Sequence, residues 1–402
     1  MTREEQIQLK RAQKREQRRK EREAWEAARG PLDLPFLLLV LVLLGIGMIM
    51  MMSASFPSAQ AEGDAFSYIK RQSIFAALGI FAMLWIGKIN YQRFRGAANI
   101  AIIVSVILLI LVIIPGIGIT RNHATRWLGL PIAGLDLTFQ PTEVAKLGII
   151  VFFAASIAKK RDRMLTFRDG IFPYLAILVG MAFLVILEPH MSGAILLLGI
   201  GAVMMIVGGI HWLYVAAAAG VGTLGVYVLL FTDLMEKIGY NSHRITTWRD
   251  PFWDPLEKSY QMAQSFITIG SGGLLGVGLG KSRQKFMFLP EEHNDFIFAV
   301  VCEELGLVGA TLIMVLFALL IIRGYWLAIH ARDRFGSLLI VGVITQIALQ
   351  TFLNIAVVSG LIPATGISLP FFSYGGTALA IQLAEMGIVL SVSRQIPAPK
   401  ND

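Results

Sequence analysis

The sequence predicts an all-α polytopic membrane protein: ten membrane-spanning helices, with a large extracellular loop between the seventh and the eighth. Of the 402 residues, 55% are hydrophobic and only 15% are charged, whereas soluble proteins carry about 25% charged residues. Apolar stretches long enough to cross ~30 Å of hydrocarbon, about 18 residues or more, recur along the chain. The connectors between these stretches alternate in basic charge, as the positive-inside rule requires, except that two external connectors, 115–141 and 232–295, carry basic residues as well.

Each predicted span is an apolar run bounded by polar or glycine-rich residues. The spans lie at 34–52, 69–87, 97–114, 143–158, 172–187, 193–210, 213–231, 296–322, 337–358 and 375–392. The strongly basic tail, 1–33, is placed in the cytoplasm, so an even number of spans also places the short tail 395–402 there. Residues 34–394 then form one membrane domain, with the extracellular loop at 232–295.

The cysteine count and the context of the glycine-rich run argue against a disulfide, a zinc site and a nucleotide-binding loop. Cys302 is the single cysteine, so there is no intrachain disulfide, and no Cys/His spacing indicates zinc. The glycine run GSGGLLGVGLG, 270–280, lacks the strand–helix context of a nucleotide-binding loop. We expect a re-entrant or tightly turned segment there.

One acid stands where a charged cluster meets an apolar span. Residues 286–306 read FMFLPEEHNDFIFAVVCEELG, and Asp295 ends the cluster. An ionisable group at the mouth of a membrane helix is a functional candidate, the alternative being a solvated loop acid. Glu303, Glu304 and Glu385 fall inside predicted spans, so each must face protein or a water-filled cavity.

A second charged pair opens the fourth span, in the sequence QPTEVAK. Glu143 and Lys146 are three residues apart and therefore share one helix face. They are either a structural cap with an ion pair or a charge pair at the external mouth that binds a phosphate or a cation.

Other polar residues also admit two interpretations. Gln346, Gln350 and Asn354 form a stripe on the ninth span, which is typical of a helix–helix hydrogen-bonding surface. The connector SGLIPATGISLPFFSYGG carries Ser373 and Tyr374 and forms either a packing turn or the wall of a ligand cavity.

These motifs together resemble the SEDS family (shape, elongation, division and sporulation). The resemblance rests on Arg126-Trp127, residues 140–146, the glycine run with KSRQK after it, residues 289–306 and GISLPFFSYGG. The compact GLGKSRQKF junction resembles the FtsW/SpoVE branch more than the RodA branch. One departure is clear: many members read QPDxGT where this chain reads EPHMSG, so His190 replaces an acid and receives no catalytic role.

The resemblance implies a peptidoglycan glycosyltransferase in the bacterial cytoplasmic membrane, with both termini cytoplasmic. It would polymerise lipid II and the undecaprenyl-pyrophosphate-linked glycan strand at the outer face. It implies Asp295 as general base. The expected substrate-binding residues are Glu143, Lys146, Arg126, Arg244, Lys285, His293, Ser373 and Tyr374.

The same resemblance implies partners: a class B penicillin-binding protein that crosslinks the strands, and other division or elongation membrane proteins, with no nucleic acid. A divalent cation, Mg²⁺ or Mn²⁺, could be organised by Glu143 or Asp295, although no metal site is assigned. Two other functions stay open: a lipid II flippase, with the polar stripe and Glu385 along its path, and a non-catalytic scaffold for a transpeptidase.

Overall fold

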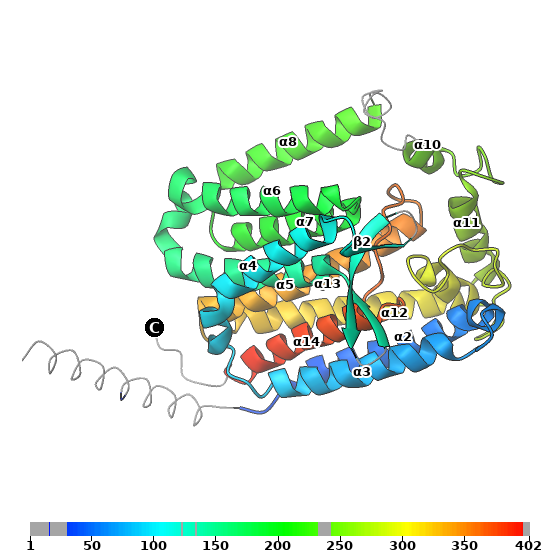
Figure 1. The fold of residues 1–402 in the computed structure, drawn as a ribbon, viewed down its shortest axis with the longest axis horizontal. Helices are drawn as coiled ribbons and strands as arrows, with labels where there is room; N and C mark the ends of the chain where they lie inside the picture. The colour runs from blue at the N-terminus through cyan, green and yellow to red at the C-terminus, as the bar shows by residue number, and fades with distance from the viewer. Residues whose placement is uncertain (1–15, 17–29, 122–123, 133–134, 232–242, 397–402) are drawn as a thin grey trace, which may run out of the picture.

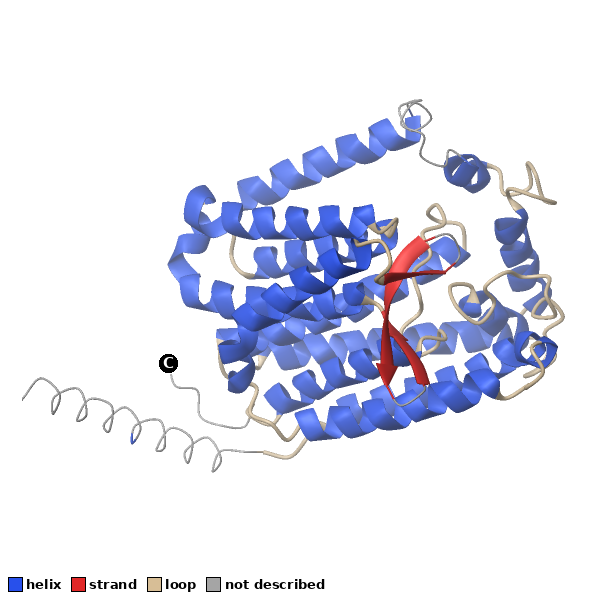
Figure 2. Cartoon of the chain, viewed as in Figure 1, coloured by secondary structure: helices blue, strands red, loops and turns tan. Residues whose placement is uncertain are grey.

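Most of the described chain lies in helices that pack as one bundle (Figures 1 and 2). The computed structural model describes residues 16, 30–121, 124–132, 135–231 and 243–396. The predicted tails 1–33 and 395–402 therefore lie almost wholly outside the described residues, as does the start of the extracellular loop. The prediction of a predominantly helical, multi-pass membrane protein is confirmed.

Eight helices of the described chain are long and apolar enough to cross a membrane. They are α2 (Leu34–Ala61), α3 (Ser67–Ile86), α4 (Gln92–Ile113), α5 (Pro141–Lys160), α6 (Phe172–Leu187, long enough when the turn from Phe167 is included), α12 (Ile297–Ile329), α13 (Arg334–Val358) and α14 (Gly376–Ser393). A 3-10 turn (Arg161–Leu165) and a π-helical turn (Phe167–Ile171) lead into α6. The two other predicted spans coincide with the apolar helices α7 (Met191–Val207) and α8 (Trp212–Phe231).

The centre of the bundle is built from α5, α13 and α14. About two thirds or more of the apolar stretch is buried in each of them (67%, 72% and 67%), against 22% in α3 and α4. All three central helices carry buried polar side chains, which hydrocarbon does not tolerate. Gln346 donates to Glu385 Oε2 at 2.8 Å and Gln382 donates to Gln350 Oε1 at 3.2 Å. Gln346 and Gln350 therefore form a helix–helix surface, as predicted, whereas Asn354, the third member of the stripe, bonds to two backbone carbonyls outside the helices.

The all-α prediction is wrong in the connector between α4 and α5, which forms a three-stranded antiparallel sheet. Its strands are β1 (Gly118–Arg121), β2 (Ala124–Ile132) and β3 (Leu135–Phe139), with β2 in the middle. Figure 2 shows them crossing one end of the bundle. The segment is too poor in consecutive apolar residues to span a membrane, and its Thr, Trp and Ile residues suit a pleated surface. Thr377 at the start of α14 donates to Thr138 O at 3.1 Å, which fixes the sheet to the bundle.

The glycine run forms a tight turn that repairs a break in α12. Gly306 has φ +68°, so the helical hydrogen-bond ladder is interrupted there. Residues 273–278 supply the missing partners: Val277 N donates to Glu303 O at 2.9 Å, and Leu307 N donates to Gly273 O at 2.9 Å. A Cβ on Gly306 would lie 2.2 Å from Gly276 N. Only glycine fits this close approach of two backbones, which confirms the expected tight turn.

The described part of the predicted extracellular segment contains two helices. They are α10 (His243–Arg249) and α11 (Tyr260–Gly272). Trp248 Nε1 donates to Gly360 O at 2.9 Å, and Ser265 Oγ donates to Val358 O at 2.9 Å. These bonds hold the segment against the end of α13 and the connector that follows it.

Candidate active site in the cavity at the end of the bundle

A cavity of about 1780 Å³ opens at the end of the bundle where the sheet and α10 lie. Its lining comes from segments far apart in the sequence, including β2, α5, the α6–α7 turn, α10 and the residues before α12 and α14. Eight of the nine predicted site residues line it: Arg126, Glu143, Lys146, Arg244, His293, Asp295, Ser373 and Tyr374.

Asp295 lies on one wall, two residues before α12 begins. Asn354 of α13 donates from Nδ2 both to Asp295 O and to Ile367 O, each at 2.7 Å. Asn354 thus ties the backbone of Asp295 to the connector that precedes α14. In the described part of the chain, the carboxylate itself has neither a hydrogen bond nor an ion pair. It is available to a ligand.

The surroundings of Asp295 raise the pKa of its carboxyl from 3.8 to about 6. Burial is the largest cause, and the negative charge of Glu291 adds to it. Arg126, Arg244 and His293 act in the opposite direction but do not outweigh the burial. A carboxyl with this pKa is ionised at neutral pH and is a stronger base than an ordinary aspartate.

The connector before α14 holds Asp295 in place. Ser373 Oγ donates to Asn294 O at 2.7 Å and accepts from Leu369 N at 2.8 Å. Tyr374 N donates to His293 O at 2.8 Å. Ser373 lines the cavity, but its hydroxyl already donates one hydrogen bond and accepts another. It therefore positions the segment that carries Asp295. Both earlier interpretations of the connector therefore apply, because it is a packing turn and a cavity wall.

An aromatic cluster stands beside Asp295. Tyr68 packs edge-to-face against His293 at 4.9 Å and against Tyr374 at 4.8 Å between ring centroids. Glu292 is buried, accepts from Ser58 and lies 3.3 Å from His293 Nδ1. His293 and Tyr374 both line the cavity beside this cluster.

The Glu143–Lys146 pair lies deeper in the cavity, in the first turn of α5. The Lys146 Nζ–Glu143 Oε1 distance is 2.9 Å, and the two side chains are 1% and 9% exposed. Glu143 Oε2 is buried without a hydrogen bond among the described residues. The pair is an ion pair at a helix start and also lines the cavity, so the structure accommodates both of the roles considered.

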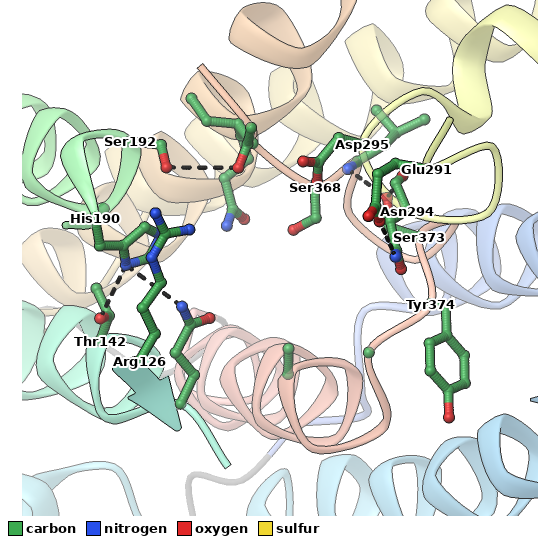
Figure 3. Close-up of a pocket in the computed structure, with 18 of the residues that line it drawn as sticks. Arg126, Thr142, His190, Ser192, Glu291, Asn294, Asp295, Ser368, Ser373 and Tyr374 are labelled. Atoms are coloured by element: carbon green, nitrogen blue, oxygen red, sulfur yellow. Dashed lines mark hydrogen bonds between the residues drawn. The ribbon is translucent and has the colours of Figure 1, made fainter. Parts of the chain in front are cut away.

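The wall opposite Asp295 is built from β2, α5 and the α6–α7 turn (Figure 3). Arg126 donates to Pro189 O, and burial lowers the pKa of its guanidinium, with a further contribution from Arg244. Arg244, on α10, donates to Ala364 O at 3.2 Å. His190 stands beside Arg126, with Nδ1 3.2 Å from Thr142 Oγ1. Burial raises the pKa of Glu188 to about 8.

Lys285 requires a correction, because it does not reach the cavity. Its ammonium is 2.9 Å from Glu304 Oε1 and donates to Gly280 O at 2.8 Å and to Ser53 Oγ at 3.0 Å. Its side chain is only 3% exposed. Lys285 fixes the glycine-rich turn to α12, and Glu304 faces protein as expected. Sequence position alone could not distinguish this buried pair from a ligand contact.

Several residues that the fold brings to the site were not predicted as site residues. Asn294 and Glu291 precede Asp295, whereas Ser192 and Thr142 lie on the opposite wall. Asn354 is not part of the cavity lining, but it holds the carbonyls of Asp295 and Ile367 by hydrogen bonds. Thr142 lies within the QPTE motif, and that motif was the only signal available for it.

The described residues do not form a metal centre. No three His, Cys, Asp or Glu side chains among them come together in a way that could hold a metal ion. Glu143 is paired with Lys146, and Asp295 stands on another part of the wall. Magnesium in enzyme sites is commonly held by one or two carboxylates together with phosphates of the substrate. A cation here would need such outside ligands.

The model of a cell cycle protein family that comprises FtsW, RodA and SpoVE matches residues 34–397. The chain belongs to this family. Stage V sporulation protein E of Bacillus subtilis is 40% identical over 331 residues, covering 82% of this chain and 88% of that protein. The probable peptidoglycan glycosyltransferase FtsW of Geobacter sulfurreducens is 38% identical over 366 residues, covering 90% of this chain and 95% of that protein.

Solved structures support the FtsW/RodA/SpoVE assignment. Rod shape determining protein RodA of Thermus thermophilus superposes with a TM-score of 0.66 at 26% identity, covering 90% of this chain and 97% of that one. A chain from a study of polymerization and crosslinking by a peptidoglycan synthase complex gives a TM-score of 0.75 at 26% identity, with 91% and 98% covered. The resemblance inferred from the motifs, including the similarity to FtsW and SpoVE, is confirmed.

Proposed function

We propose that this protein is a peptidoglycan glycosyltransferase that polymerises lipid II at the outer face of the cytoplasmic membrane. The observation that carries the proposal is Asp295, a carboxylate without a partner in the described chain, in a cavity that also holds Arg126, Arg244 and Lys146. A base and several cations in one cavity suit a transfer between a hydroxyl and a sugar diphosphate. FtsW relatives that carry this activity in their names support it.

The reaction would use the two walls differently. Asp295 accepts the proton of the 4-hydroxyl of the acceptor lipid II, and the oxygen bonds to the anomeric carbon of the donor strand. The bond from that carbon to the diphosphate oxygen breaks, and undecaprenyl diphosphate leaves with the electron pair. Arg126, Arg244 and Lys146 stabilise the negative charge that develops on the leaving group.

The flippase alternative has less support in this fold. A transport path would need polar side chains free to meet a passing headgroup. Gln346 is bonded to Glu385, and Gln350 to Gln382, across the α13–α14 contact. These bonds occupy the side chains in helix packing, although Gln350 and Gln382 also line the cavity. The scaffold alternative leaves the unpaired carboxylate in a large cavity unexplained, because a scaffold would not require it.

The direct test is synthesis of glycan strands from lipid II by the purified protein with its cognate class B penicillin-binding protein. A transpeptidase partner is proposed because a structural relative belongs to a complex that couples polymerization and crosslinking. Formation of glycan strands that contain many disaccharides would support the glycosyltransferase proposal. Translocation of lipid II in vesicles without polymer would favour the flippase, and activity of the partner's transpeptidase alone would favour the scaffold.

A divalent cation is proposed only as a companion of the substrate. Mg²⁺ or Mn²⁺ would bind with the diphosphate and take one carboxylate oxygen from Glu143 or Asp295. No step of the transfer above depends on it.

Ten spans with both termini in the cytoplasm are proposed for the chain in its membrane. We expect Leu256→Cys, on the extracellular segment and 87% exposed, to react with a membrane-impermeant maleimide in intact cells. Arg168→Cys, which is exposed in the connector before α6, is the matched control and should react only after permeabilisation. Cys302 is buried and gives little background. The reverse labelling pattern would overturn the orientation.

The two arginines of the cavity should bind the diphosphate. Changing Arg126 or Arg244 to Ala is expected to weaken lipid II binding about ten-fold or more, because charge-assisted bonds to phosphate are strong, and changing either to Lys should cost less. Binding of lipid II and of undecaprenyl monophosphate to each purified variant measures this. Arg249→Ala, on the same helix as Arg244 but outside the cavity lining, is the control. Unchanged affinity in both variants would mean that they only tether the external segments.

The pKa of Asp295 predicts how the rate depends on pH. A general base acts when deprotonated, so kcat/KM should be level above about pH 6 and fall about ten-fold per unit below it. Initial rates of polymerisation between pH 5 and 8 measure the inflection. A profile that stays level down to pH 5 would contradict the assignment of Asp295 as the base.

A further inference from the structure

His190 lies on the cavity wall that faces Asp295, at the residue before α7 (Figure 3). Its side chain is largely buried, with 9% of the residue exposed. One ring nitrogen, Nδ1, is 3.2 Å from Thr142 Oγ1 and 3.4 Å from Gln140 Nε2. The other nitrogen, Nε2, has no hydrogen-bond partner among the described residues.

These contacts fix the tautomer of the ring. The amide nitrogen of Gln140 can only donate a hydrogen bond, whereas the hydroxyl of Thr142 also lies 3.5 Å from Glu188 Oε2 and so does not decide the direction. Nδ1 must therefore be the acceptor, so the proton of the neutral ring is on Nε2. Burial lowers the pKa of His190 to about 3, and the positive charges of Arg126 and Lys146 add to the effect. The ring is neutral at physiological pH.

The charges around the ring indicate what Nε2 binds. Arg126 stands beside His190 on the same wall (Figure 3), and Lys146 lines the cavity as well. A neutral N–H beside the Arg126 guanidinium, in a cavity that Lys146 also lines, suits an oxygen acceptor that carries negative charge. A carboxylate at this position would accept rather than donate, and it would repel such an oxygen.

We propose that the His190 Nε2–H group donates a hydrogen bond to the diphosphate of the lipid substrate and positions it across the cavity from Asp295. The inference rests on the proposed function. In this chain the position offers a donor, whereas the family members that read QPDxGT have an acid there. His190 is thus a positioning residue for the leaving group, distinct from the base.

Three variants at this position separate a donor at Nε2 from a packing role. The amide of His190→Gln can place an N–H near the site of Nε2, His190→Asn can reach only the site of Nδ1, and His190→Asp restores an acid. The matched control is His211→Asp, the same change in the turn between α7 and α8. The probes are undecaprenyl diphosphate and undecaprenol, bound to the purified full-length protein.

We expect His190→Asp to bind undecaprenyl diphosphate about ten-fold or more weakly, with undecaprenol unaffected. His190→Asn should also bind weakly, His190→Gln within about three-fold of the natural protein, and His211→Asp unchanged. In polymerisation, His190→Asp should raise KM for lipid II more than it lowers kcat. A purely structural residue would instead lower the thermal midpoint and weaken both lipids alike.

Diphosphate binding by His190→Asp that equals that of the natural protein would overturn the inference, as would equal losses in His190→Gln and His190→Asn. The outcome is separable from the proposed function. If the natural protein makes no polymer with its partner, the glycosyltransferase proposal fails while the binding comparison still decides the role of His190. If it makes polymer and His190→Asp binds normally, only the role of His190 fails.

Discussion

Replacing Asp295 with asparagine is expected to abolish glycan polymerisation, lowering kcat by about 10²-fold to 10⁴-fold, the range for loss of a general base. Asparagine keeps the shape of the side chain and cannot accept the proton. The backbone bonds from Asn354 to Asp295 O and from Ser373 to Asn294 O do not involve the carboxylate, so they persist. Polymer length and yield from purified protein, with its partner present, measure the effect.

The fold of this variant should be at least as stable as that of the natural protein. The folded-state pKa of Asp295 is raised from 3.8 to about 6, so the native state loses stability as the pH rises through that interval. Asparagine removes this cost at neutral pH, and the thermal midpoint should stay level or rise. Asp250→Asn, an exposed acid of the same predicted extracellular segment, is the control and should leave activity unchanged. Near-normal polymer from the Asp295 variant would remove Asp295 from the mechanism.

Removing the Lys146 ammonium is expected to have the second-largest effect, on both stability and activity. In Lys146→Met the carboxylate of Glu143 remains buried without its cation, which typically costs about 3–5 kcal/mol. The double variant Glu143→Gln with Lys146→Met removes both charges and should recover most of that stability. Its polymerisation rate should still be at least about ten-fold low, because the cation that we propose for the leaving group is missing.

Thermal unfolding in detergent and polymerisation of lipid II, measured on the same preparations, separate the two roles. The exposed pair of Lys70 and Asp64, also 2.9 Å apart, provides the control, and Lys70→Met should change neither quantity appreciably. If the double variant regains both stability and activity, the pair is a structural cap only.

The sequence predicted the helical part of the fold well because bilayer thickness fixes the length of an apolar helix. All ten predicted spans coincide with helices, although several observed boundaries extend beyond the predicted ones. The sheet was missed because its strands are short and give no long apolar signal. Asp295, Glu143 and Lys146 could be found from the sequence, since charge is conspicuous beside apolar spans.

The sequence by itself thus determined the membrane class, the family and the charged residues that a site could use. Only the tertiary structure decided which of these charges meet. Lys285 and Arg126 both lie in predicted extracellular connectors, yet one is buried against Glu304 and the other lines the cavity. The tautomer of His190 likewise depends on Thr142 and Gln140, about fifty residues earlier. Spacing along a helix fixes neighbours within three or four residues, whereas contacts between helices are set by packing of the whole bundle.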